Sequence, residues 1–391
     1  MRRVVANGAL LILSFLVGYF VIQLGFFRLL LPSMRLTVRP HLPELADVLV
    51  QTSKSQYVPR DYIALLGDSY AEGTGDWLLD VQGNEAQPFH SAHVIHELTG
   101  RDVVSFGRGG AGSAEAIVLR PTRILESSRC ISFPRIGIPN RIVIYFYEGN
   151  DLEDNLAFAR KVQAAEGRVD AAGVDAYLRS NYAAFSSWRC QLYLGDTIGR
   201  MIKFAYQSRW ARQDENFPPY PAGPAGPGTN PIEIAGKVVG IPVALQGPAL
   251  ELSDAEIALG GMVLDRSLAW LRNRFAALPV TIVYVPSPLS VYRLKGPVLY
   301  SVGQRHERGG ETASAEAVNP NSTRICKLVR EAALRHGAQL LDARPELRAL
   351  AEKTLIHGPR DWGHFNEAGY RALGRMVTRH LADGSGAADC D

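Results

Sequence analysis

Four short segments of the chain carry the residue types that nucleophilic catalysis requires. Segment 67–69 (GDS) offers a serine hydroxyl, and segment 361–364 (DWGH) offers a histidine three residues after an aspartate. A histidine can take the proton of a serine, and an aspartate can orient that histidine through its other ring nitrogen. Segments 107–112 (GRGGAG) and 149–151 (GND) offer backbone and side-chain amides that can donate to an oxyanion. The combination predicts acyl chemistry at Ser69.

These segments lie among stretches that predict a parallel β-sheet. Five apolar, β-branched or aromatic runs predict its strands, at 61–66, 101–106, 141–148, 280–286 and 338–343. Amphipathic helices are predicted between and after them, at 89–100, 253–278, 319–337 and 366–381. Nearly continuous apolar strands between such helices are typical of an α/β domain whose sheet is covered on both faces. Open α/β sheets bind ligands at the carboxyl ends of their strands, where segments 67–69, 107–112 and 149–151 fall.

Two helix starts and one interruption complete the predicted organisation. Ser253 and Glu256 form a capping-box pattern, and Asn319 followed by Pro320 predicts a capped start for the next helix. Residues 155–250 interrupt the alternation, because they include a run too rich in proline and glycine for regular structure. We interpret them as an insertion between the third strand and the next helix.

With these residues in place, the sequence resembles the SGNH (GDSL-type) hydrolase superfamily. The resemblance rests on GDSY at 67–70, the glycine block at 107–112, GND at 149–151 and the DxxHFN pattern at 361–366. It spans about residues 61–381 and leaves the insertion and the N-terminal segment unmatched. It implies a flavodoxin-like three-layer sandwich around a central five-stranded parallel sheet.

The resemblance also implies a role for each site residue. Ser69 is the nucleophile, and its own backbone amide forms part of the oxyanion hole. Gly110 gives a second amide and Asn150 a side-chain donor, while His364 and Asp361 complete the catalytic triad. The resemblance implies neither a metal nor an organic cofactor.

The glycine block admits other interpretations. It often begins with an asparagine in the family, where this chain has Ser105, so Gly107 and Gly109 remain alternatives to Gly110. The block also matches a dinucleotide fingerprint, GxGxxG. That interpretation is disfavoured, because the block follows the second strand and the first candidate acidic partner, Glu148, lies far beyond the usual spacing of about 20 residues.

The N-terminus predicts a membrane anchor. Residues 4–27 carry no charge and span roughly 36 Å as a helix, enough to cross a bilayer core of about 30 Å. The segment lacks the short apolar core and small-residue cleavage site of a signal peptide. We therefore expect a retained anchor at 4–27, a linker at 28–60 and the hydrolase-like domain at 61–383, with its insertion at about 155–250.

Charges around this anchor leave its orientation open. Arg2 and Arg3 precede the span and favour a cytoplasmic N-terminus, whereas Arg28, Arg35 and Arg39 follow it and oppose that orientation. We expect a non-cleaved signal-anchor in the plasma (inner) membrane, with the catalytic domain on the extracytoplasmic side.

Composition limits the partners. The chain has 391 residues with 42 basic and 39 acidic side chains, a net charge of +3 too small and dispersed for nucleic-acid binding. The cysteines form no CxxC pair, so they are free thiols or form one or two disulfides: Cys130, Cys190, Cys326 and Cys390. His90, His93 and His96 recur every three residues of one helix, a spacing that favours structural histidines over a metal site.

These observations together predict a membrane-anchored serine esterase or O-acyltransferase. By analogy with anchored members of the superfamily, its substrate is an acyl ester on an acetylated cell-envelope or secreted polysaccharide. A lipid-directed esterase is an alternative, with an acyl groove built from aromatic residues of the insertion: Phe185, Trp188, Tyr193, Phe204, Tyr206 and Trp210. A non-catalytic glycan-binding or assembly protein that keeps the fold is a second alternative.

Overall fold

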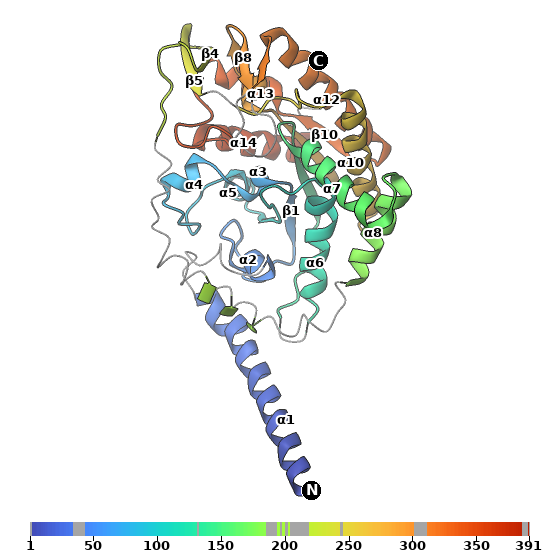
Figure 1. Cartoon of the computed structure of the whole chain (residues 1–391). Helices are drawn as coiled ribbons and strands as arrows, with labels where there is room; N and C mark the ends of the chain where they lie inside the picture. The colour runs from blue at the N-terminus through green and yellow to red at the C-terminus, as the bar shows by residue number, and fades with distance from the viewer. Residues whose placement is uncertain are drawn as a thin grey trace.

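A computed structural model provides the architecture of the chain (Figure 1). It describes residues 2–33, 44–130, 133–184, 194–195, 198–199, 202–203, 219–242, 245–300, 311–384 and 390. The six aromatic residues of the expected acyl groove lie outside these ranges. Arg35, Arg39 and Cys190 lie outside them as well.

The centre of the molecule is a five-stranded parallel sheet, as the apolar runs predict. Its strands are β1 (Tyr62–Leu66), β2 (Asp102–Ser105), β3 (Arg141–Tyr147), β6 (Val280–Val285) and β10 (Gln339–Asp342). Their order across the sheet is β10-β6-β3-β1-β2, with every neighbouring pair parallel. The direction of strand addition therefore reverses between β1 and β3, and this reversal point is where such sheets bind ligands.

Alternating side chains divide the interior into two hydrophobic cores, one on each face of the sheet. Ala64 and Leu66 of β1 belong to one core, whereas Ile63 and Leu65 belong to the other. This follows from the two-residue period of a strand. The protein is therefore an α/β protein with helices on both faces of the sheet, as the sequence predicts.

Each face has its own set of helices. The first face is covered by α2 (Glu44–Val50), the π-helix η4 (Ala114–Leu119), α6 (Arg120–Ser127), α7 (Asp151–Glu166), α8 (Ala171–Ala184), α10 (Asp254–Arg274) and α12 (Ala315–Arg335). The second face is covered by α5 (Ser91–Thr99), α13 (Arg344–Ala351) and α14 (Glu367–Asp383). Figure 1 shows α7, α8 and α10 side by side on one flank of the domain.

Short elements surround the edge of the sheet that carries the carboxyl ends of its strands. The short helices are α3 (Ser69–Glu72), α4 (Asp76–Asp80) and α11 (Pro288–Val291). A small antiparallel sheet is formed by β4 (Thr229–Ile234), β5 (Lys237–Pro242) and β7 (Arg293–Leu294), and a hairpin by β8 (Val298–Tyr300) and β9 (Glu311–Ala313). The expected insertion thus contains most of α7, all of α8 and the strands β4 and β5.

Of the two predicted helix starts, one is confirmed and one is wrong. Ser253 and Glu256 form the capping box of α10, with Ser253 N–H donating to Glu256 Oε2 at 2.9 Å. The other helix, α12, begins earlier than expected, at Ala315, so Pro320 lies inside it and Asn319 does not cap it. Pro320 lacks the backbone N–H that the interior of a helix normally uses for its hydrogen bonds. The helix tolerates this loss because Val318, one turn from the helix start, is fully buried and holds this end of α12 against the domain.

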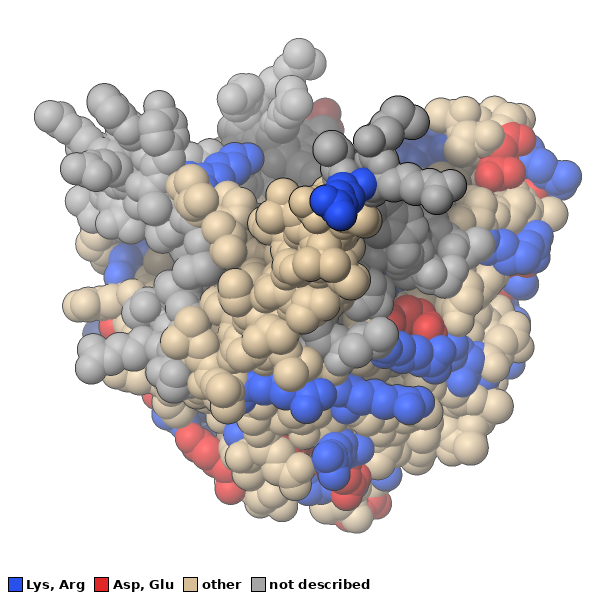
Figure 2. Space-filling view, turned by 90° about the horizontal axis from the view of Figure 1, so that it is seen from below, with Lys and Arg blue, Asp and Glu red and all other residues tan. Residues whose placement is uncertain are grey.

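The N-terminal helix α1 (Arg2–Gly25) leads through η1 (Phe26–Leu30) and η2 (Leu31–Ser33) into the domain. Within the described residues, Val5–Leu30 is the helical stretch long and apolar enough to cross a membrane, a test that a signal sequence also passes. Its end is anchored: Phe27 is fully buried, its ring centroid lies 4.2 Å from that of Phe133, and its carbonyl accepts the Tyr57 hydroxyl at 2.7 Å. Lys and Arg side chains lie on the face from which α1 projects (Figure 2).

The described part of the expected linker is packed rather than extended. Ala46, Val48 and Leu49 of α2 are fully buried in the first core. Gln51 follows them and exchanges two hydrogen bonds with the backbone of Ser105, at 2.7 and 2.8 Å. Residues 44–60 therefore belong to the folded domain and support the loop that follows β2.

Three of the four cysteines form disulfides in the structure. Cys326 in α12 is bonded to Cys390, across a sequence separation of 64 residues. Cys130 is also disulfide-bonded. Of the options that the sequence left open, the structure therefore selects disulfides over free thiols for these three cysteines.

Candidate active site

Ser69 is the first residue of α3, and only Gly67 and Asp68 separate it from β1. Asp68 caps this helix, because its carboxylate accepts the Tyr70 N–H at 3.0 Å. Gly67 makes the preceding turn with φ of 144°, and a Cβ there would lie 2.8 Å from the Tyr145 carbonyl oxygen. Only glycine fits so close to β3, so the turn holds Ser69 at the carboxyl end of the sheet.

His364 reaches Ser69 from the opposite end of the chain. Its Nε2 lies 2.8 Å from Ser69 Oγ, although the residues are 295 positions apart. Its Nδ1 lies 2.7 Å from Asp361 Oδ2. Both distances are hydrogen-bond distances suitable for proton transfer and orientation. The structure thus brings together the three side chains that the sequence selects for a triad.

The hydrogen bonds and charges of this relay shift the pKa values of His364 and Asp361 in opposite directions. Burial lowers the pKa of His364, but its hydrogen bond to Asp361 and the charges of Asp361, Asp68 and Glu72 outweigh burial and raise it above 6.5. Burial acts to raise the pKa of Asp361, yet His364 and two backbone N–H groups hold it below its usual value. An ionised Asp361 can stabilise the imidazolium that forms during proton transfer.

Asp76 fixes the loop that carries Asp361 and His364. Its carboxylate is buried and accepts the backbone N–H groups of Arg360 at 3.1 Å and of Asp361 at 2.9 Å. The Tyr70 hydroxyl adds a bond to the Gly363 carbonyl at 2.8 Å. Sequence reasoning missed Asp76. The one sequence feature that could have pointed to it is its place seven residues after the predicted nucleophile.

Asn150 lies three residues after the end of β3 and occupies the N-cap position of α7, but its side chain makes no capping hydrogen bond. Its side chain makes no hydrogen bond to any described residue, and its Oδ1 is buried. The buried atom that lacks a partner is the Oδ1 acceptor, whereas an oxyanion requires the Nδ2 donor of the same amide. That Nδ2 makes no hydrogen bond to the described residues, so the donor role that the sequence predicts for Asn150 remains a prediction.

The glycine block lies beside Ser69, and its amides differ in what they bind. A Cβ on Gly109 would lie 3.8 Å from Ser69 Cβ. Gly107 N–H donates to Ser105 Oγ at 3.0 Å and Gly109 N–H to Glu72 Oε2 at 2.7 Å. Gly110, with φ of 68°, makes no backbone N–H hydrogen bond to the described residues. Among the three alternatives, this leaves Gly110 as the available amide.

Ser105 and Glu72 explain how the block is held. Ser105 Oγ donates to the Ala71 carbonyl at 2.5 Å and accepts Gly107 N–H, so it ties the block to α3. The serine found where the family often has asparagine therefore has a structural role in this chain. Glu72 was not selected from the sequence; it holds Gly109 and contributes negative charge near His364.

Two buried carboxyls lie behind the site. Burial raises the pKa of Asp68, and burial together with the charges of Asp68 and Asp154 raises that of Asp151 well above its usual value. Asp151 Oδ2 accepts the Tyr147 N–H at 2.9 Å, which closes the turn after β3. Both residues therefore shape the turns that present Ser69 and Asn150.

The remaining histidine and cysteine groups have structural contacts. His90 Nδ1 caps α5 by accepting Ala92 N–H at 3.3 Å, His93 Nε2 lies 2.8 Å from Thr52 Oγ1, and His96 Nδ1 lies 2.7 Å from the Arg101 carbonyl oxygen. Each histidine thus has its own separate partner. Cys326 and Cys390 lie near Asp342, but their sulfurs are bonded to each other and are not available as thiolate ligands.

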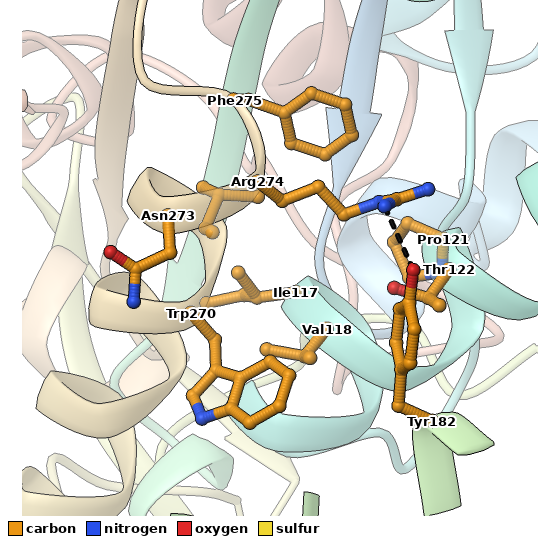
Figure 3. A pocket seen from close by; sticks show the side chains of 10 residues that line it. Ile117, Val118, Pro121, Thr122, Tyr182, Trp270, Asn273, Arg274 and Phe275 are labelled. Atoms are coloured by element: carbon orange, nitrogen blue, oxygen red, sulfur yellow. Dashed lines mark hydrogen bonds between the residues drawn. The ribbon is translucent and has the colours of Figure 1, made fainter. Parts of the chain in front are cut away.

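An apolar cavity lies away from the triad. It has a volume of about 320 Å³ and an apolar lining from η4, α6 and α10, which includes Ile117, Trp270 and Phe275 (Figure 3). Arg274 crosses it and donates to the Tyr182 hydroxyl at 2.9 Å. None of the predicted site residues lines this cavity.

No protein-family model matches the chain, and no curated protein matches it significantly. The chemistry of the site must therefore be inferred from its own geometry. Three features define that geometry at the reversal point of a parallel sheet: a serine–histidine–aspartate relay, and a side-chain amide and a backbone amide that make no hydrogen bond to the described residues.

Proposed function

We propose that this protein is a serine esterase or O-acyltransferase of the SGNH type. The observation that carries the proposal is the relay from Ser69 through His364 to Asp361, with distances of 2.8 and 2.7 Å. The strand order β2-β1-β3-β6-β10 supports it, because this is the flavodoxin-like order that the superfamily implies.

In the proposed reaction, His364 accepts the hydroxyl proton of Ser69 while Ser69 Oγ bonds to the ester carbonyl carbon. The carbonyl oxygen becomes an oxyanion, which the amides of Ser69, Gly110 and Asn150 stabilise as donors. The intermediate collapses with cleavage of the bond between the acyl carbon and the alcohol oxygen. The alcohol leaves with the proton from His364, and an acyl-Ser69 ester remains.

The second half of the reaction uses the same groups. A water molecule or a sugar hydroxyl gives its proton to His364 and attacks the acyl carbon. Ser69 Oγ then leaves and recovers that proton, which releases a carboxylic acid in hydrolysis or a new ester in transfer. His364 returns each proton that it accepts, so the protons and electron pairs balance in both halves of the reaction.

We further propose that the domain acts on the extracytoplasmic side of the plasma membrane, on O-acetylated polysaccharide. The apolar helix that ends at Leu30 supports membrane attachment. The bond between Cys326 and Cys390 supports an oxidising compartment, where disulfides form and persist. The choice of an acetylated glycan rests on analogy with anchored members of the superfamily.

A covalent serine probe and a series of p-nitrophenyl esters test the proposal. The full chain in detergent should react with a fluorophosphonate and hydrolyse the acetyl ester faster than esters with longer acyl chains. Ser69→Ala should abolish both reactions. Ser267→Ala is the matched control, because Ser267 is fully buried in α10 and bonds the Val263 carbonyl. Labelling that persists in Ser69→Ala would contradict the proposal.

A further inference from the structure

A second cavity, with a polar lining, adjoins the glycine block. Its volume is about 230 Å³, and it lies between η4, α7 and α8. Its lining consists of Gly110, Gly112, Glu115, Leu119, Asp154, Ala157, Phe158, Lys161 and Tyr177. None of the three triad residues lines it.

Gly110 connects this cavity to the reacting centre. Its amide is the proposed oxyanion donor, and the same residue forms one wall of the cavity. On the other wall, Asp154 lies one helical turn beyond Asn150, and its N–H donates to the Asn150 carbonyl at 2.9 Å. An ester whose carbonyl oxygen contacts Gly110 and Asn150 would therefore place one of its substituents at the cavity entrance.

The walls are held by hydrogen bonds rather than by exposed loops. Asn155 Oδ1 accepts the Ser113 N–H at 2.7 Å, and its Nδ2 donates to the Gly260 carbonyl at 3.0 Å. A Cβ on Gly112 would lie 2.8 Å from Asn155 Oδ1, so the glycine block packs directly on α7. The cavity is thus preformed, which lowers the entropic cost of binding.

Its lining combines hydrogen-bonding groups with apolar surface. Asp154 and Glu115 offer carboxylates, Lys161 an ammonium and Tyr177 a phenol, while Phe158 and Leu119 supply apolar walls. Burial, together with the charges of Asp68 and Glu153, raises the pKa of Asp154 to about 7. Near neutral pH this carboxyl can both donate a hydrogen bond to a hydroxyl and accept one.

We propose that this cavity binds the sugar residue that carries the scissile ester. The inference rests on the proposed esterase or transferase function. A sugar ring presents hydroxyls at its edge and apolar C–H groups on its faces, which matches this lining. The cavity is smaller than the roughly 300–1,000 Å³ of sites for drug-sized ligands, so it suits one ring rather than a long acyl chain.

Charge also favours a sugar that bears no acidic group. The lining holds two carboxyl groups against one ammonium, Lys161, and Glu115 additionally pairs with Arg123 outside the cavity. A phosphate or carboxylate on the ligand would meet Glu115, and also Asp154 whenever that carboxyl is ionised, and like charges repel. A neutral hexose is therefore the ligand class that the lining favours.

A variant that fills the cavity tests this proposal. Ala157→Phe places a ring from α7 into the cavity, and Arg160→Phe is the matched control, because Arg160 is exposed on the same helix. The substrates are 6-O-acetyl methyl glycosides of glucose, galactose and mannose, with p-nitrophenyl acetate as the ester that lacks a sugar. For each variant, the measured quantity is kcat/KM on the best acetyl glycoside divided by kcat/KM on p-nitrophenyl acetate.

We expect Ala157→Phe to lower this ratio at least tenfold and Arg160→Phe to leave it within twofold of the wild-type value. Asp154→Asn should lower it as well, because it removes a carboxylate while keeping the size of the side chain. An unchanged ratio in Ala157→Phe would overturn the proposal, as would an equal fall in both variants.

Binding provides a measurement that does not depend on catalysis. Saturation-transfer NMR on Ser69→Ala should show contact with the parent methyl glycosides, and Ala157→Phe in the same background should abolish it. Absence of contact in Ser69→Ala would overturn the sugar site even if the wild type hydrolyses p-nitrophenyl acetate. Contact in a protein that hydrolyses no ester would instead leave the sugar site standing and refute the esterase function.

Discussion

The Asp76 carboxylate accepts the backbone N–H of Asp361 at 2.9 Å, although 285 positions separate the two residues. Asp76 follows the predicted nucleophile by seven residues, so this bond ties the histidine loop to the segment that carries Ser69. Asp76 is buried and also accepts the Arg360 N–H. We infer that Asp76 is a positioning residue, since it holds the relay without touching the reacting atoms.

Asp76→Ala should lower kcat by roughly 10²-fold with little change in KM, because a displacement of about 1 Å at the reacting groups can cost that much. Asp76→Asn should retain most of the rate, because its amide oxygen still accepts the two N–H groups. Steady-state kinetics on p-nitrophenyl acetate measures both values, and circular dichroism checks the fold. An equal loss in both variants would point to a role for the charge rather than for positioning.

Ser69→Ala and His364→Ala should each lower kcat by about 10⁴-fold or more, because nucleophile and base act as one unit. Asp361→Ala should cost less, because some members of the superfamily tolerate a weak third residue. The double variant Ser69→Ala/His364→Ala should be no slower than either single variant. Retention of more than a tenth of the activity in Ser69→Ala would end its assignment as the nucleophile.

Asn150→Ala should lower kcat by about 10²–10³-fold and leave KM nearly unchanged, because an oxyanion donor acts chiefly in the transition state. The Asn150 side chain makes no capping hydrogen bond to α7, so its removal should not destabilise that helix. The melting temperature of the variant checks this second expectation. A variant that keeps kcat but loses substrate affinity would assign Asn150 to binding instead.

The sequence was informative wherever local patterns determine structure. The five apolar runs predicted the strands, and the glycine turns at their ends predicted where Ser69 and Asn150 would lie. Asp76 and Glu72 could not be found in this way, because each acts on backbone N–H groups of a distant segment. The helix start predicted from Asn319 and Pro320 was wrong for a related reason. Proline favours the first turn of a helix, but packing of Val318 places that turn earlier.

The pH dependence of kcat/KM should report the raised pKa of His364. The histidine must be neutral to accept the Ser69 proton, so activity should fall as the pH drops below that pKa. Burial opposes protonation, but Asp361 and the charges of Asp68 and Glu72 raise the pKa above 6.5. Asp361→Asn removes the largest of these favourable interactions and should move the acid limb to lower pH. A limb that stays in place would show that His364 is not the titrating base.

The bond between Cys326 and Cys390 leads to a prediction about compartment. It closes a loop with a sequence separation of 64 residues, for which the chain-entropy relation gives roughly 4 kcal/mol of stabilisation. Such a bond persists in an oxidising compartment and is rare in the cytoplasm. If the domain is extracytoplasmic, non-reducing peptide mapping of protein from native membranes should recover Cys326 and Cys390 joined.

A fusion reporter decides the orientation of the anchor, and unfolding measurements test how much the disulfide stabilises the chain. A C-terminal alkaline phosphatase fusion should be active, because that enzyme needs its own disulfides and folds outside the cytoplasm. Cys390→Ser should lower the urea midpoint of the full chain, and dithiothreitol should lower the midpoint of the wild type, because each removes the bond between Cys326 and Cys390. An inactive fusion together with reduced Cys326 would place the site inside the cell, and the polysaccharide substrate would then have to be abandoned.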